Sequence, residues 1–381
     1  MYMKVAIIDP LGAHGSSHHF YLFGQLDGLK RNNVNVSLYT NSKTENPNID
    51  GVKFYQTYGD LFLSNNFFIN GFRFLLGSFR SILHARISRI KAFHFHIFHI
   101  NFLVLINLLL IKLLFGKLIL TIHDVSSFAK SQTPSLISNF AYKLADVILT
   151  HNKYSHNEII KLDSSLKPKI HTIPHGNYLP FINIIEDKNK SRGYLDLPEE
   201  KIIVMFFGMI KEVKGLDILL KSFKKVVDKN PNVVLLIAGK PWKTDFSFYQ
   251  SIIEKNQLED HVILHTKFIS HNDVKYYYSA SDLVVLPYKK IYQSGVLMMT
   301  LSYGKAALIS DLPAITEVVT DNENAFLFKS EDVNDLAEKL NIILCNKQNL
   351  ERVSKNGRVL MQKKFSWNEI GRLTKIAYQT L

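Results

Sequence analysis

The sequence predicts an α/β protein built from two Rossmann-like halves, each with a parallel sheet. Strand-like and helix-like segments alternate along nearly the whole chain, which is typical of parallel sheets. The chain has 381 residues, a length that suits two domains. The alternation is interrupted over residues 177–198 by a polar and charged stretch typical of a linker. Ligands in such sheets bind outside the carboxyl ends of the strands, so a cleft between the halves is the expected site.

The first half begins with a strand, a loop and a helix, predicted at Lys4–Ile8, 10–17 and His18–Arg31. Later strands are predicted at Val34–Tyr39, Phe98–Asn101, Leu118–Ile122, Val147–Leu149 and Ile170–Ile173, with a helix at Phe102–Phe115. Gly116 follows this helix, where a helix C-terminal cap is expected.

The second half restarts the pattern with a strand at Lys201–Phe207, whose nearly continuous apolar residues suit a buried parallel strand. Helices are predicted at Leu216–Lys229, Asn272–Ser279 and Val296–Tyr303, and strands at Val233–Ala238, Val262–Leu264, Leu283–Pro287 and Ala306–Ser310.

The composition indicates which classes of partner the protein is expected to bind. The net charge is +13, and residues 1–175 carry 18 basic and 9 acidic residues, hence +9. A basic half suggests an anionic partner: a membrane surface, a phosphorylated acceptor or nucleic acid. No nucleic-acid-binding motif is recognisable, so nucleic acid is not expected. The single cysteine, Cys345, suits a reducing compartment, and no signal peptide is visible, which predicts a cytoplasmic protein.

Two loops between a strand and a helix are typical of phosphate binding. In the first, Gly208 permits a tight turn and close ligand approach, and Lys211 and Lys214 offer positive charge to a diphosphate. In the second, Ser294 and Gly295 stand at a helix start, where free amides and the helix dipole attract an anion. A plain strand-to-helix turn and a simple serine cap are the structural alternatives.

Together these loops resemble family 4 glycosyltransferases of the GT-B fold. The resemblance rests on Gly208, Lys214-Gly215, Ala238-Gly239, residues 281–287, Gln293-Ser294-Gly295, Gly304-Lys305-Ala306 and residues 309–319. It implies transfer of a sugar from a nucleoside-diphosphate sugar to an acceptor, with retention of configuration and without a metal or other cofactor. The donor is a UDP- or GDP-sugar, and the acceptor a glycan or a polyprenyl-diphosphate-linked glycan of bacterial surface polysaccharide or lipopolysaccharide biosynthesis.

The same resemblance assigns roles to individual positions. Residues 196–366 form the donor domain, and residues 1–176 form the acceptor domain, to which a last helix at 367–381 crosses back. Lys211, Lys214 and the amides at Ser294-Gly295 neutralise the leaving diphosphate. The donor is further contacted by Gly208, Gly239, Phe268, Ile269, Gln293 and Glu317.

The predicted donor domain departs from the family pattern at three positions. Met209 stands where an arginine is usual, and Ile291 and Met299 stand where two glutamates are usual. These departures motivate an alternative, a catalytically silent partner subunit of a glycan assembly complex. A further alternative is an inverting enzyme, for which Asp9, Asp124 or a loop histidine would be the base.

The amino-terminal half supplies the remaining predicted site residues. Gly15 and Ser16 lie in the family's glycine-rich loop near the donor or acceptor, where they replace the common pair of glycines. His123 follows a strand where the family has a histidine beside the donor sugar. A structural histidine capped by Asp124 is the alternative for His123. Histidines 14, 18 and 19 suggest a metal, but no carboxylate or cysteine clusters with them, so no metal site is predicted.

Residues 67–91 interleave large apolar side chains with arginines. A basic, amphipathic segment can dock on anionic lipid, so peripheral contact with the inner face of the plasma membrane is predicted. The alternative is that the apolar side packs on the domain core and the arginines are merely solvated.

Overall fold

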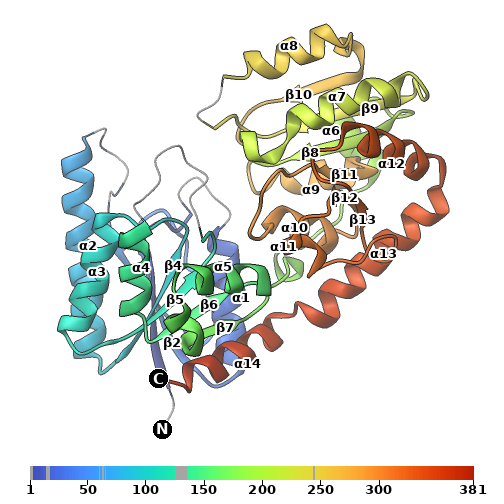
Figure 1. The fold of residues 1–381 in the computed structure, drawn as a ribbon. Coiled ribbons are helices and arrows are strands. Elements are labelled where there is room, and N and C mark those ends of the chain that lie inside the picture. Colours follow the sequence, from blue (N-terminus) through green and yellow to red (C-terminus); the bar gives the residue numbers. More distant parts are fainter. Residues whose placement is uncertain are drawn as a thin grey trace. The chain divides into compact units, whose positions relative to one another are not determined.

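The computed structural model describes residues 3–13, 18–59, 61, 64, 66–125, 135–242 and 245–381. The chain divides into two compact units, residues 1–176 with 365–381 and residues 177–364 (Figure 1). Each unit is a parallel sheet with helices packed against it, so the predicted α/β class with two Rossmann-like halves is confirmed.

The first unit contains a seven-stranded sheet in the order β3-β2-β1-β4-β5-β6-β7. Its elements are β1 (Lys4–Asp9), α1 (His18–Arg31), β2 (Asn35–Asn41), β3 (Lys53–Tyr58), α2 (Phe67–Ile87), β4 (Ala92–Ile97), α3 (Phe102–Leu113), β5 (Lys117–Ile122), α4 (Ser135–Leu144), β6 (Val147–Thr150), α5 (Lys153–Leu162), β7 (Ile170–Thr172) and α14 (Trp367–Tyr378).

The second unit contains a six-stranded sheet in the order β10-β9-β8-β11-β12-β13. Its elements are α6 (Lys188–Tyr194), β8 (Ile202–Phe207), α7 (Leu216–Val227), β9 (Val233–Ala238), α8 (Ser247–Lys255), β10 (Val262–His265), α9 (Val274–Ala280), β11 (Leu283–Leu286), α10 (Gly295–Ser302), β12 (Ala306–Ser310), α11 (Pro313–Thr316), β13 (Phe326–Phe328), α12 (Val333–Cys345) and α13 (Lys347–Lys364). In each sheet the direction in which successive strands are added reverses once, between β1 and β4 in the first sheet and between β8 and β11 in the second. This is the doubly wound topology.

One predicted strand lies in the wrong place. Residues 98–101 precede α3 as a loop, and the strand is β4, whose sequence is AFHFHI. Its histidines suggest a half-exposed strand, yet His94 is fully buried and hydrogen-bonded to Tyr378 and Thr121. Because of its polar histidines, β4 lacks the apolar run that is typical of a strand buried on both faces of a sheet.

The stretch predicted as a linker packs as part of the second unit. Arg192 on α6 is 2% exposed, and its guanidinium binds Asp282 at 2.9 Å and the carbonyl of Ala280 at 3.2 Å. Pairing and hydrogen bonding offset the cost of burying this charge, so the segment is held against α9 and β11.

Helix α14 packs on α1 through close backbone contact. A Cβ at Gly28 would lie 2.0 Å from the carbonyl oxygen of Trp367, and one at Gly371 would lie 2.1 Å from the carbonyl oxygen of Gly28. The Trp367 side chain fills the space left by Gly24 and Gly176. The carboxy-terminal helix is therefore fixed to the first unit by glycines that no larger residue can replace.

This packing predicts that Gly28→Ala lowers the free energy of unfolding by about 1–3 kcal/mol, because the added methyl forces the two helices apart. Urea unfolding measures the change. Gly193→Ala on α6 is the matched control, since its Cβ meets nothing within 4 Å, and it should not destabilise the fold. Equal stability of the two variants would contradict the assigned contact.

Candidate functional site

The two phosphate-type loops of the second unit lie against each other. They follow β8 and β11, which pair in parallel, so both leave the same edge of the sheet. Gly215, with φ +68°, allows this approach, because a Cβ there would lie 1.8 Å from the carbonyl oxygen of Pro287. A Cβ at Gly208, with φ +106°, would lie 3.3 Å from Val296 at the start of α10. The structure thus brings the first predicted loop to the start of α10.

Aromatic rings position both predicted lysines. The Lys211 ammonium lies 4.4 Å from the centroid of the Trp242 ring, and that of Lys214 lies 3.9 Å from the centroid of Tyr288. Both side chains are half-buried. A cation over a ring face is attracted by the ring quadrupole and keeps its charge. The two rings therefore restrain both lysine side chains.

The Tyr288 side chain connects the two loops, because its ring lies under Lys214 of the first loop and its hydroxyl reaches Ser294 of the second. It is hydrogen-bonded to the Ser294 hydroxyl at 3.0 Å, and Ser294 accepts a bond of 3.0 Å from the Leu297 amide as the N-cap of α10. Lys214, Tyr288 and Ser294 thus form a continuous set of contacts at the amino end of a helix. The amide-rich end of a helix attracts anions, and a neighbouring ammonium strengthens that attraction.

The other residues predicted to contact the donor lie outside the Lys214–Tyr288–Ser294 contacts. The Gln293 Oε1 atom is buried without a hydrogen-bond partner, and a buried acceptor of this kind is suited to a ligand donor. Gly239, with φ +150°, ends β9 and is packed against the Gly208 carbonyl. Phe268 is exposed and Ile269 half-buried after β10. Glu317 is exposed and lines a pocket of about 430 Å³ with Thr320 and Lys363.

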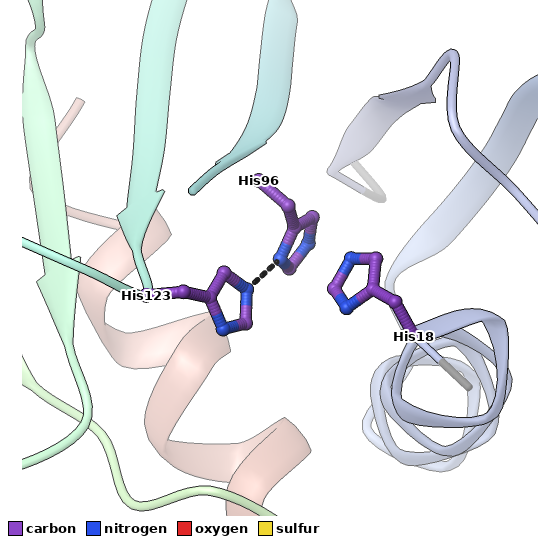
Figure 2. Close-up of side chains that lie close together, drawn as sticks. All are labelled: His18, His96 and His123. Carbon is purple, nitrogen blue, oxygen red and sulfur yellow. Dashed lines mark hydrogen bonds between the residues drawn. The ribbon is translucent and has the colours of Figure 1, made fainter. Parts of the chain in front are cut away.

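The amino-terminal site has a row of histidines at the carboxyl ends of neighbouring strands. His96 lies near the end of β4, His123 follows β5, His151 follows β6, and His175 lies beyond β7. Successive ring centroids are 5.3, 4.8 and 5.4 Å apart, close to the spacing of strands in a sheet. His18, in the first turn of α1, lies 5.0 Å from His123 by ring centroids (Figure 2). Gly15 and Ser16, and His14, lie outside the described residues.

Short contacts between ring nitrogens join three histidines of the row, His96, His123 and His151, into a chain. His96 Nδ1 lies 3.0 Å from His123 Nε2, and His123 Nδ1 lies 3.2 Å from His151 Nε2. The ends of the chain are Gln25 Oε1, 3.0 Å from His96 Nε2, and the Ile173 carbonyl, 3.1 Å from His151 Nδ1. His123 is 2% exposed, and both of its ring nitrogens are engaged by other histidines.

Burial keeps these histidines neutral at pH 7. It lowers the pKa of His18, His94 and His175 to about 3 and that of His151 to about 4. The pKa values of His96 and His123 are also well below the usual range, for the same reason and because the rings face one another. A neutral ring offers one donor and one lone pair.

Asp9, at the carboxyl end of β1, is a second perturbed group. Burial raises the pKa of its carboxyl to about 7, although the amides of Gly12 and Leu11 donate to it at 2.9 and 3.3 Å. A carboxyl with this pKa is partly protonated at neutral pH, which suits either a turn-capping group or a general base.

Comparison with known proteins identifies the second unit. Residues 187–360 match the family described as glycosyl transferases group 1. The capsular polysaccharide biosynthesis glycosyltransferase CapM of Staphylococcus aureus is 25% identical over 233 residues, 59% of this chain and 60% of that protein. The chain spans half to three fifths of the length of the first curated relatives that it matches. Most of the carboxy-terminal unit is therefore similar to the group 1 glycosyltransferases.

Solved structures show that the whole chain has the GT-B fold. Sucrose-phosphate synthase from Thermosynechococcus elongatus is 18% identical, covers 99% of this chain and 98% of its own, and superposes with a TM-score of 0.77. The HepE protein of Anabaena in complex with UDP-glucose is 15% identical, covers all of both chains and gives a TM-score of 0.76. These likenesses extend over both units, whereas the family match is confined to the second.

The residues matched by the family include the predicted site residues of the second unit but not those of the first. Lys211, Lys214, residues 293–295 and Glu317 fall within the matched residues, and His123, Gly15 and Ser16 fall outside them. The sequence analysis missed Tyr288, Trp242, His96 and His151, which hold or contact the predicted residues. The positions of His96 and His151 near strand ends were a usable signal, because neighbouring parallel strands end at one edge.

The neutral histidines predict acid instability. Their pKa values are lower in the folded chain than the usual 6.5, so the folded state binds fewer protons and loses stability as the pH falls below about 6.5. Each adds about 1.4 kcal/mol of destabilisation per pH unit until its folded pKa is reached. The free energy of unfolding, measured with urea at several pH values between 7.5 and 5, should fall less steeply with decreasing pH in His175→Gln than in the wild type. His99→Gln is the control, because His99 is exposed, and its pH dependence should equal that of the wild type. Identical slopes for all three proteins would contradict the burial effect.

Proposed function

We propose that the protein transfers a sugar from a UDP- or GDP-sugar to a glycan or polyprenyl-diphosphate-linked acceptor in bacterial surface polysaccharide biosynthesis. The observation that carries the proposal is the contact set Lys214–Tyr288–Ser294 at the start of α10. It places a cation and helix amides where a departing diphosphate gains most from them. The CapM relative, named for capsular polysaccharide biosynthesis, and HepE, solved with UDP-glucose, support the substrate class.

In the proposed reaction Lys211, Lys214 and the amides at Ser294-Gly295 take up the charge that develops on the diphosphate as the sugar–oxygen bond breaks. No metal ion is required at this step, because fixed cations and dipoles supply the stabilisation. The acceptor hydroxyl attacks the front face of the sugar, and a donor phosphate oxygen accepts its proton, so configuration is retained. Gln293 Oε1, a buried acceptor, receives a hydroxyl hydrogen of the donor sugar.

An inverting mechanism is the second candidate, and the raised pKa of Asp9 favours it. Such a mechanism needs a base near the acceptor, and a carboxyl with a pKa of about 7 can accept a proton at neutral pH. The anomeric configuration of the product, determined by NMR, separates the two: the donor's own configuration supports retention, and the opposite one supports Asp9 as the base.

We expect UDP or GDP to raise the melting temperature of the wild-type protein equally with and without EDTA, while ADP and dTDP do not, because a ligand of the native state stabilises it. In Lys214→Ala this rise is lost, and release of nucleoside diphosphate from the donor slows about 10²–10³-fold. Lys221→Ala is the control, an exposed lysine on α7, and should resemble the wild type. No rise with any nucleotide would instead favour a silent partner subunit.

We propose that the first unit docks on the inner face of the plasma membrane through α2 and α3. These helices lie side by side (Figure 1). Both present exposed apolar side chains, namely Phe67, Phe68, Phe72, Ile87, Phe102 and Leu113, each at least 67% exposed. Residues 61–123 contain seven basic residues and no acidic residue. Two of the seven, Lys112 and Lys117, are paired with Asp146. Apolar side chains beside an excess of basic residues suit an anionic lipid surface. No helix among the described residues is long and apolar enough to cross a bilayer.

Docking predicts that the protein co-sediments with vesicles containing phosphatidylglycerol and not with neutral phosphatidylcholine vesicles. Phe67→Ser with Phe68→Ser should weaken binding about tenfold or more, since each buried phenylalanine contributes about 1.5–3 kcal/mol. Phe248→Ser is the control, because Phe248 is 53% exposed on α8 in the other unit. Equal binding of both variants would contradict docking through α2.

A further inference from the structure

Three histidines from separate elements of the first unit converge on one point. His96 comes from β4, His123 from the end of β5 and His18 from the first turn of α1 (Figure 2). One ring nitrogen of each lies within 4.8 Å of those of the others. His123 is buried, and His18 and His96 are half-buried. These nitrogens are therefore close enough for small side-chain movements to place them around a single ion.

The hydrogen-bond chain determines which nitrogens carry protons. The Ile173 carbonyl can only accept, so His151 donates through Nδ1 and its Nε2 accepts from His123 Nδ1. At the other end Gln25 Oε1 accepts from His96 Nε2. In neutral rings the remaining nitrogens, His96 Nδ1 and His123 Nε2, both carry lone pairs, and they face each other at 3.0 Å. Two facing lone pairs at this distance repel each other, and a cation between or beside them removes the repulsion.

The geometry points to a binding site for a divalent transition-metal ion of the zinc class, with His18, His96 and His123 as its protein ligands. Three imidazoles with a fourth position open are a common zinc environment. At zinc–nitrogen distances of about 2.0–2.1 Å, tetrahedral ligand atoms lie about 3.3 Å apart, so the facing pair needs little movement. Ligating histidines usually donate their other ring N–H to an acceptor, as His96 does to Gln25 and His123 does to His151.

The ion would tie the first turn of α1 to the carboxyl ends of β4 and β5. This site differs from the one weighed from the sequence, since His19 and His14 are not its ligands and two of the three histidines come from strand ends. It is also separate from the proposed diphosphate site, whose residues all lie in the second unit. The metal proposal therefore does not depend on the proposed reaction.

Metal content of the full-length protein tests the inference. The chain is stripped by dialysis against EDTA, equilibrated with Zn²⁺ and analysed for bound metal, and about one ion per chain is expected. His96→Asn and His123→Asn should each lose the ion. His99→Asn is the matched control, because His99 is exposed three residues beyond His96, and it should keep the ion. Far-UV circular dichroism and urea unfolding of each variant check that the first unit remains folded.

Cobalt gives an independent measurement. Co²⁺ bound by three imidazoles in a four-coordinate site should give intense visible absorption bands, which His18→Asn should weaken or abolish. Gln25→Leu removes the acceptor for His96 and should lower Zn²⁺ affinity about 10–100-fold, whereas Gln25→Glu should retain it. No bound metal at micromolar Zn²⁺, or equal metal in all the variants, would overturn the proposal. His96 would then carry its proton on Nδ1 and donate it to His123 Nε2, with the Gln25 side-chain amide turned to donate to His96 Nε2.

Discussion

The parallel pairing of β8 with β11 is the constraint on which the proposed donor site depends. Residues about 80 positions apart in sequence become neighbours because both strands end at the same edge of the sheet. Gly215 then packs against the Pro287 carbonyl, and Tyr288 reaches both Lys214 and Ser294. Each loop alone is an ordinary strand-to-helix turn. Only their contact places the Lys214 ammonium group beside the start of α10.

The two units use the same topology with different interiors. The strands of the second unit are almost wholly apolar, with aliphatic and phenylalanine side chains. In the first unit the sheet interior continues into a row of histidines, and burial lowers their pKa values enough to keep them neutral. Neutral imidazoles can be buried because each finds a hydrogen-bond partner. The first unit therefore buries titratable groups in its interior, whereas the strands of the second unit bury apolar side chains.

Each lysine of the proposed site depends on an aromatic partner. A lysine loses several freely rotating bonds when it binds a ligand, and a ring that already restrains the side chain reduces that entropic cost. Tyr288 and Trp242 supply the rings. Lys289, the neighbouring basic residue, is instead paired with Asp217 at 2.9 Å and is thereby neutralised. The lysines around this site therefore differ in their partners: Lys211 and Lys214 contact aromatic rings, and Lys289 contacts a carboxylate.

The sequence by itself determined the fold class, most strand positions, the glycines at the turns and the serine at the start of α10, because these follow from local periodicity and backbone preference. It misplaced β4, whose buried histidines imitate an exposed strand, and it gave no sign that Arg192 holds the segment after residue 177 against the second unit. Only the tertiary structure decided which strand ends are adjacent. The histidine row and the Tyr288 contacts result from that order, which long-range packing sets and no local pattern encodes.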